Sequence, residues 1–167
     1  MSDEAPEEIE VTFTQQDPCT LYTRPVRVVM EQIAAVIRAI PVPAEVYDGT
    51  NLDDLTGRLA SFLTRTNGGP AAIVCYGGST FDSLPRRTST VNVVTVSCDT
   101  RPAHGMPGAL DASWQIAAAL DHGVSTQRRK GESTVSDLIT VSSEETVQLK
   151  NCGAACAVVL QLTIRDY

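Results

Sequence analysis

The sequence predicts an α/β (α+β) fold, a two-layer sandwich in which a mixed or antiparallel sheet of about five strands packs against three helices. Three observations predict it. Apolar residues recur at helical spacing in three segments, and apolar or alternating runs between them are typical of strands. The hydrophobic content of 43% and the charged content of 20% are those of an ordinary globular domain. Because strands follow one another directly in two places, strict βαβ winding is not expected.

The chain has 167 residues, enough for one domain of the usual size of roughly 100–200 residues. We expect an acidic N-terminal arm over residues 1–20 and a single domain over residues 21–167. The arm has five acidic residues among its first ten and too little apolar surface to fold alone. Its segment 9–13 alternates, so Ile9, Val11 and Phe13 are expected to form an edge strand on this subunit or on a neighbouring one.

The first element expected in the domain is an amphipathic helix. Apolar residues at helical spacing over residues 26–40 predict it, Pro25 suits its first turn, and Pro41 ends it. Residues 44–48 then have the alternation of a short strand.

A second helix is expected directly after this strand. Thr50 or Asn51 can cap it, and Asp53 and Asp54 lie in its first turn, where the helix dipole favours negative charge. The glycines and proline of residues 67–70 break it. The two neighbouring carboxylates are therefore explained without a catalytic role.

Two strands are expected next. Residues 71–76 form a continuous apolar run, which is typical of a strand buried on both faces. We expect a glycine turn at Gly77 and Gly78, then an excursion from Phe81 to Arg87 into a long strand over residues 86–99.

A third helix is predicted over about residues 110–121 by the helical spacing of its apolar residues. Trp114, the only tryptophan, is expected to anchor this helix in the core. The basic segment from Gln127 to Gly131 is expected to be a polar loop. Apolar runs over residues 138–141 and 156–164 predict the last two strands.

Charge and composition exclude several classes of protein. Thirteen lysines and arginines against twenty acidic residues give a formal charge of −7, which disfavours nucleic acid and anionic lipid as partners. No apolar run approaches the roughly 20 residues of a membrane span, and the first residues lack the features of a secretory signal. We therefore expect no membrane association and a cytoplasmic protein whose five cysteines stay reduced.

No group of residues in the sequence predicts an enzyme. Cys152 and Cys156 are the one close cysteine pair, whereas a closed zinc site needs four ligands, and His104 and His122 lie elsewhere. Residues 76–80 follow a strand as phosphate loops do but lack the required lysine. We expect no catalytic, cofactor-binding or metal-binding residue and no cofactor. A small cytosolic α/β enzyme with a thiol or carboxylate site is the alternative from a different class.

Three segments carry a resemblance to a known family. They are Leu52-Asp53-Asp54-Leu55 with its helix, the strand and turn Pro70-Ala71-Ala72-Ile73-Val74-Cys75-Tyr76-Gly77-Gly78, and the outgoing strand from Thr90 to Cys98. Together they resemble the Mu-like tail terminator, or tail-completion, family of contractile-tailed phages and prophages. The resemblance covers roughly residues 25–167 and leaves out the acidic arm.

The resemblance implies a structural role in a virion. Such proteins form a ring, usually hexameric, at the head-proximal end of the tail, stop the polymerisation of tube and sheath, and dock to the neck. The implied partners are further copies of this chain, the tail tube and sheath proteins and the neck or connector protein, with DNA only passing through the lumen. The implied location is the tail or neck of a virion assembled in the host cytoplasm. Another head-tail connector or neck ring protein is the alternative within this class.

Two charged loops are the contact regions that we expect, because loops positioned by a rigid sheet commonly carry function. One contains Phe81, Arg86 and Arg87, and the other contains Arg128, Arg129 and Lys130. Planar guanidinium groups make paired hydrogen bonds with carboxylates. We therefore expect these loops to reach acidic residues on an adjacent copy or on the neck.

Overall fold

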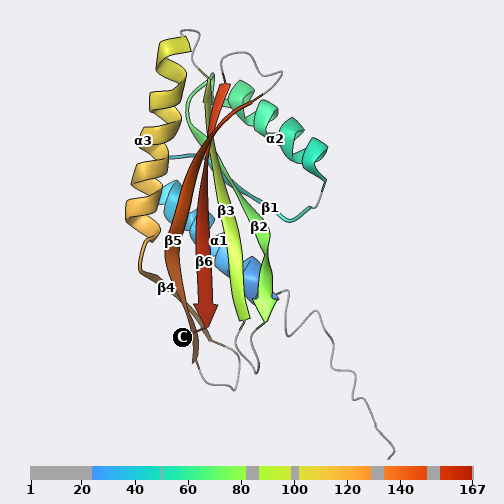
Figure 1. The fold of residues 1–167 in the computed structure, drawn as a ribbon, viewed down its shortest axis with the longest axis vertical. Coiled ribbons are helices and arrows are strands. Elements are labelled where there is room, and N and C mark those ends of the chain that lie inside the picture. Colours follow the sequence, from blue (N-terminus) through green and yellow to red (C-terminus); the bar gives the residue numbers. More distant parts are fainter. Residues whose placement is uncertain are drawn as a thin grey trace, which may run out of the picture.

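A computed structural model describes residues 24–49, 51–81, 87–98, 102–128, 134–149 and 155–166. The acidic arm, with Ile9, Val11 and Phe13, lies outside the described residues. Within them, three helices pack on one mixed sheet (Figure 1). This architecture confirms the predicted α+β fold class.

The sheet has six strands in the order β1-β2-β3-β6-β5-β4. β1 is parallel to β2, and the other neighbouring pairs are antiparallel. The centre of the sheet is the pair of β3 and β6, which are far apart in the sequence. The strands are β1 Ala44–Tyr47, β2 Ala71–Phe81, β3 Arg87–Cys98, β4 Gly123–Arg128, β5 Thr134–Gln148 and β6 Ala155–Asp166.

The three helices are α1 Arg24–Ala39, α2 Leu52–Arg65 and α3 Pro102–Leu120. They use both faces of the sheet. Ala72 and Val74 of β2 belong to the apolar core under α1 and α3, whereas Ile73 and Cys75, which alternate with them, pack with α2. α3 and α2 accordingly flank the upper part of the strands on opposite sides (Figure 1). α2 thus adds a partial third layer to the two layers expected.

Two helices begin and end close to where the sequence predicts. The spacing of Val29, Ile33 and Ile37 buries one face of α1 almost completely. Asn51 caps α2, because its Oδ1 atom accepts a hydrogen bond from the backbone N–H of Asp53 at 2.9 Å.

The glycine pair after residue 76 does not form the predicted turn. β2 continues through Gly77 and Gly78 to Phe81, with a β-bulge between Tyr76 and Gly78. Gly78 has a φ of +113°, which L side chains rarely adopt, so glycine permits this irregularity within the strand. The predicted excursion is shorter as a result, since Phe81 ends β2 and Arg87 faces it at the start of β3.

The expected polar loop from Gln127 to Gly131 is also corrected. Gln127 and Arg128 belong to β4 and pair with Val135 and Thr134 of β5. β5 extends well beyond the predicted 138–141, and its side chains over residues 142–148 are all exposed. An exposed strand needs no apolar residues, so no hydrophobic pattern marks it in the sequence.

Candidate functional site

Trp114 lies on the surface of α3, contrary to the prediction that it anchors the helix in the core. Its side chain is 57% exposed. The helix faces the sheet through Ala112, Ser113 and Ile116, which are buried. Small residues at this contact let α3 pack closely on the sheet, and Trp114 falls outside the contact.

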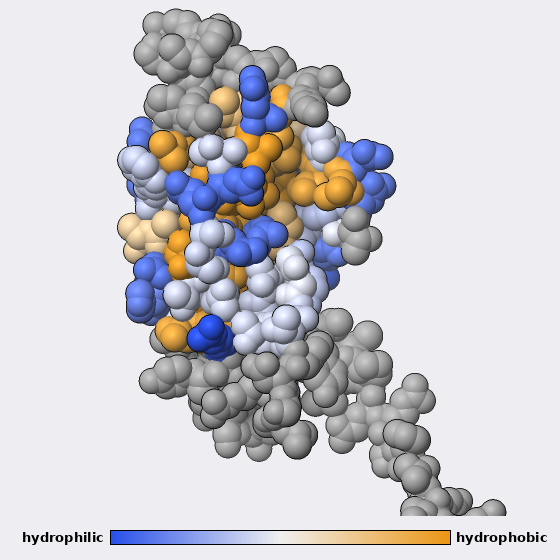
Figure 2. Space-filling view, viewed as in Figure 1, coloured by the Kyte–Doolittle hydropathy of each residue, from blue (hydrophilic) through white to orange (hydrophobic). Residues whose placement is uncertain are grey.

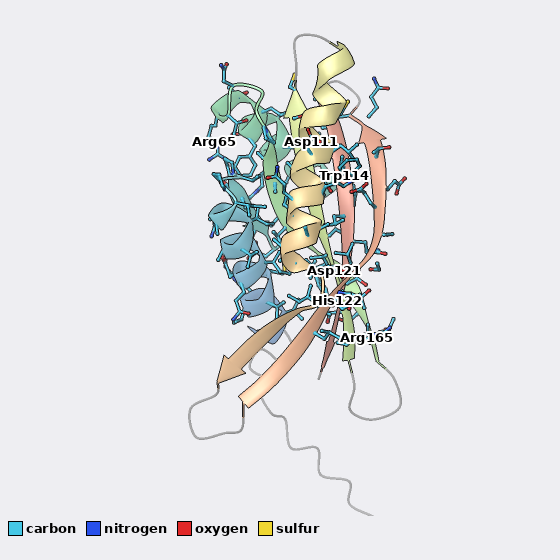
Figure 3. The ribbon with its side chains drawn as sticks, turned by 90° about the vertical axis from the view of Figure 1, so that its left-hand side faces the viewer. Arg65, Asp111, Trp114, Asp121, His122 and Arg165 are labelled. Atoms are coloured by element: carbon cyan, nitrogen blue, oxygen red, sulfur yellow. The ribbon has the colours of Figure 1, made fainter. Side chains whose placement is uncertain are left out.

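A carboxylate on β5 holds the Trp114 side chain in place. Trp114 Nε1 donates a hydrogen bond to Glu144 Oε1 at 3.3 Å, and the buried Ser113 hydroxyl donates one to Glu144 Oε2 at 3.1 Å. Figure 3 shows Trp114 on the side of α3 that faces β5. An exposed indole with a fixed orientation loses little conformational entropy when it binds a partner.

The neighbouring part of β5 is an open edge of the sheet. The last described pair between β4 and β5 is Gly123 with Ile139, and no described strand continues along this side of β5. At one position of this edge a side chain takes the place of a strand, since Asp121 Oδ1 accepts a hydrogen bond from the N–H of Val141 at 3.0 Å. This hydrogen bond is the main cause that lowers the pKa of Asp121, with the charge of His122 contributing in the same direction.

Three exposed residues of α3 and one just beyond its end follow one another at helical spacing along this edge: Asp111, Trp114, Ala118 and Asp121. We call these residues together with Glu144 and Thr146, which lie on the α3 side of β5, the α3–β5 surface. It combines an aromatic residue, the open backbone edge of β5 and the acidic side chain of Glu144. Among the side chains described on it, none is basic, although His122 beside it pairs with Asp121 through Nδ1 at 3.0 Å.

The arginines of α1 and α2 whose side chains the structure describes are engaged within the chain. Their ion pairs are exposed, so each is worth about 0–1 kcal/mol. Arg38 Nε donates to the carbonyl oxygen of Ala44 at 2.9 Å. The pairs are Arg27 with Asp48 at 3.1 Å, Arg58 with Asp54 at 3.4 Å and Arg65 with Glu45 at 2.8 Å.

The two basic segments expected to make contacts each include the end of a described strand. Arg87 begins β3 and Arg128 ends β4 opposite Thr134, and these strand ends lie at the same, lower end of the sheet (Figure 1). Arg86, Arg129 and Lys130 are outside the described residues. The fold therefore separates this basic end from the acidic α3–β5 surface, which lies along the side of the molecule.

Cys75, a candidate nucleophile, lies buried on β2. Burial raises the pKa of the Cys75 thiol to about 11, so this group is protonated at neutral pH. Asp53 and Asp54 remain at the start of α2. Among the described residues, no three His, Cys, Asp or Glu side chains group closely enough to hold a metal ion.

A smaller apolar patch lies on the α2 side of the sheet. Val147 is 37% exposed, and Leu149 and Val159 are partly buried beside it. Hydrophobic residues gather in the upper middle of this face in Figure 2. No helix in the described ranges is long and apolar enough to cross a membrane.

Comparison with protein-family models and with curated protein sequences finds no match to this chain. The α3–β5 surface is therefore described from its geometry alone. The sequence contained one signal for it, the spacing of Asp111, Trp114, Ala118 and Asp121, which places a tryptophan between two acidic residues on one stripe of the helix.

Proposed function

We propose that this chain is a structural protein of a phage virion that assembles into a ring at the head-proximal end of the tail. In this role it ends the polymerisation of tube and sheath and docks to the neck, without catalysing a reaction. The resemblance of residues 25–167 to the Mu-like tail terminator family supports the proposal. The observation that carries it is the open edge of β5 beside the exposed Trp114.

This observation favours assembly because both features are typical of interfaces. Open strand edges pair readily with other chains, and tryptophan is among the residues that contribute most to binding energy. The strand edge belongs to a sheet whose central strands are buried, and the helix that carries Trp114 packs on this sheet, so the surface has a rigid support.

The distribution of charge favours contacts between unlike surfaces of successive copies. The basic end of the sheet and the acidic α3–β5 surface are different parts of one molecule. Contacts between unlike surfaces close into rings when the rotation between copies permits it. The resemblance implies that the ring contains six copies.

Another head-tail connector or neck ring protein remains the second candidate, since the same surface suits any ring of this kind. The alternative of a thiol enzyme is disfavoured at Cys75, because a buried thiol with a pKa of about 11 supplies almost no thiolate at neutral pH.

Two measurements test the proposal. Sedimentation or native mass measurement of the purified chain, alone and with tail ends, is expected to show a ring of several copies. Electron microscopy of phage particles that lack the protein is expected to show overlong tails, which indicates a terminator, whereas tails of normal length without heads indicate a connector. A chain that stays monomeric in both settings contradicts the proposal.

A further inference from the structure

The two central strands of the sheet carry a second open surface, on the side of the sheet that faces α2. In the upper part of this side, Val94 and Val96 of β3 pack in the apolar cluster of α2. Further down, the residues that face each other across β3 and β6 become polar, and none of their side chains is buried. The lower part of this face is mostly pale or blue in Figure 2. The pairs are Asn92 with Gln161, Thr90 with Thr163 and Thr88 with Arg165, and we call these six residues the polar sheet face.

The polar sheet face offers hydrogen-bonding groups on a rigid support. Its two strands are buried on their opposite side by the core under α1 and α3. One of its hydroxyl groups is further fixed from β5, because Ser142 Oγ and Thr163 Oγ1 share a hydrogen bond at 2.9 Å. Hydroxyl and amide side chains both donate and accept hydrogen bonds. This face can therefore bond the open N–H and C=O groups of a strand edge.

The edge of β5 beside α3 has such open groups. The N–H of Leu149 donates to the carbonyl oxygen of Ala155 on β6 at 3.3 Å. Because backbone groups alternate in direction along a strand, those of Glu144, Thr146 and Gln148 point away from β6, toward the open edge. The edge thus presents donors and acceptors on the same side as the α3–β5 surface.

The carboxylate of Glu144 determines which charge a partner must bring. The groups that donate to it, the indole of Trp114 and the hydroxyl of Ser113, are both neutral. A chain that covers Glu144 must supply a cation, because a buried carboxylate without a cation is costly. Arg165 is exposed and makes no ion pair within the described part of the chain. Its guanidinium can bond the carboxylate and stack on the exposed face of Trp114.

Arg165 and Glu144 cannot meet within one copy. Leu160 lies opposite Glu144 in the ladder of β5 and β6, and Arg165 lies roughly 17 Å further along β6 at about 3.3 Å per residue. The two side chains also lie on opposite sides of the sheet, since Glu144 bonds α3 and Arg165 belongs to the α2 side. Figure 3 shows Trp114 beside the upper half of the strands and Arg165 near their lower end. A contact between them therefore needs a second copy.

We propose that the polar sheet face of one copy docks on the α3–β5 surface of the next copy, with Arg165 paired with Glu144 and stacked on Trp114. This inference rests on the self-assembly proposed above and names the two surfaces in contact. The charge complementarity of these surfaces selects a second copy as the occupant. Because they are different parts of the chain, each copy can use both at once, as a ring requires.

A double-mutant cycle tests the pairing of the two charges. Glu144→Gln removes the charge but keeps an acceptor oxygen for Trp114, and Arg165→Gln keeps a polar side chain. Each change is expected to weaken association about five- to tenfold, and the two together hardly further, because both remove the same contact. Arg27→Gln is the matched control, since Arg27 is also exposed but already pairs with Asp48, and it is expected to associate as the wild type does. Sedimentation measures association, and thermal unfolding shows that each variant is folded.

Cross-linking tests which surfaces meet. The background keeps the buried Cys75 and replaces the other four native cysteines by serine. In it, Thr146→Cys places a thiol on the α3–β5 surface, and Thr163→Cys places one on the polar sheet face. A short bismaleimide is expected to join the two variants when they are mixed and to join neither with itself. Cross-linking of the Thr146→Cys variant with itself would assign the edge to the same edge of a second copy and overturn this docking.

Trp114 fluorescence gives a readout without cysteine chemistry, because Trp114 is the only tryptophan. On assembly of the wild type, quenching by acrylamide is expected to fall. An assembled wild type in which Trp114 stays fully accessible, or additive effects of the Glu144 and Arg165 changes, overturns this interface and leaves self-assembly standing. A wild-type chain that is monomeric at every concentration and on tail ends overturns both the interface and the proposed function.

Discussion

Asp121, just beyond the end of α3, accepts through Oδ1 a hydrogen bond from the backbone N–H of Val141 at 3.0 Å. Val141 lies on the open edge of β5, where a bulge separates it from Ser143. The carboxylate thus takes the place of a neighbouring strand at one position of the edge. It joins the helix and the strand that form the α3–β5 surface.

This hydrogen bond predicts a pH dependence of stability. The hydrogen bond from the Val141 N–H is the main cause that lowers the pKa of Asp121 in the folded protein. The ionised carboxylate therefore stabilises the fold at pH values above the unfolded pKa of about 3.9, and this stabilisation is lost as pH falls through the folded pKa. In Asp121→Asn the amide keeps an acceptor oxygen but does not titrate. Urea unfolding gives the free energy of unfolding of wild type and of Asp121→Asn. The amount by which wild type is more stable should shrink as pH falls from about 5 to about 2. A constant difference over this range contradicts the assignment.

Two glycine-to-alanine changes are expected to change the free energy of unfolding in opposite directions. Gly57 lies within α2 with nothing within 4 Å of an added Cβ, so Gly57→Ala should raise the free energy of unfolding by about 0.5–1 kcal/mol. Gly78 also has open space around it but a φ of +113°, so Gly78→Ala should lower the free energy of unfolding by about 1–3 kcal/mol. Denaturant unfolding measures both. The same sign for the two variants would show that backbone conformation at Gly78 does not matter.

The orientation of α3 is tested by two neighbouring side chains. Ile116 is fully buried, and Ile116→Ala should cost about 2–5 kcal/mol of stability because it leaves a cavity. Trp114→Ala should cost only about 1 kcal/mol, since the side chain is 57% exposed and loses mainly its hydrogen bond to Glu144. Thermal or urea unfolding of the two variants gives the comparison. A larger loss for Trp114→Ala would place the tryptophan in the core after all.

The Cys75 thiol is expected to be unreactive in the folded protein. Its pKa of about 11 leaves almost no thiolate at pH 8, and burial blocks access to a reagent. In a variant that keeps Cys75 and replaces the other four cysteines by serine, modification by a disulfide reagent should become fast only in denaturant. Rapid modification under native conditions would reopen the thiol-enzyme alternative.

The parts of the fold that the sequence predicts are those in which burial imposes a pattern on the residues. Ile33 and Ile37 repeat at the spacing of a helix face, and the interior strands β2, β3 and β6 are apolar because helices cover the sheet on both faces. Asn51 as a cap is predictable for a local reason, since its side chain bonds a backbone N–H two residues away. These signals depend on a few neighbouring residues or on a large buried area.

The candidate site lacks such signals. Glu144 belongs to an exposed strand, which carries no apolar pattern, and its contact with Ser113 and Trp114 joins segments about thirty residues apart. The small buried residues of α3, such as Ala112, do not reveal which side of the helix faces the sheet. The prediction that Trp114 anchors the third helix in the core is therefore wrong, and only the packing of α3 shows which side of the helix faces the sheet.

The central position of β6 affects how the protein can be synthesised. β6 inserts between β3 and β5, and it follows both of them in the sequence. During translation, β1 to β3 and the hairpin of β4 and β5 leave the ribosome first, as two incomplete sheets in which β3 and β5 are additional open edges. They can join only after β6 has emerged, because it is the strand between them. A nonsense mutation before residue 155 therefore removes the connection between the two halves, and such fragments are expected to be degraded before they reach an assembling particle.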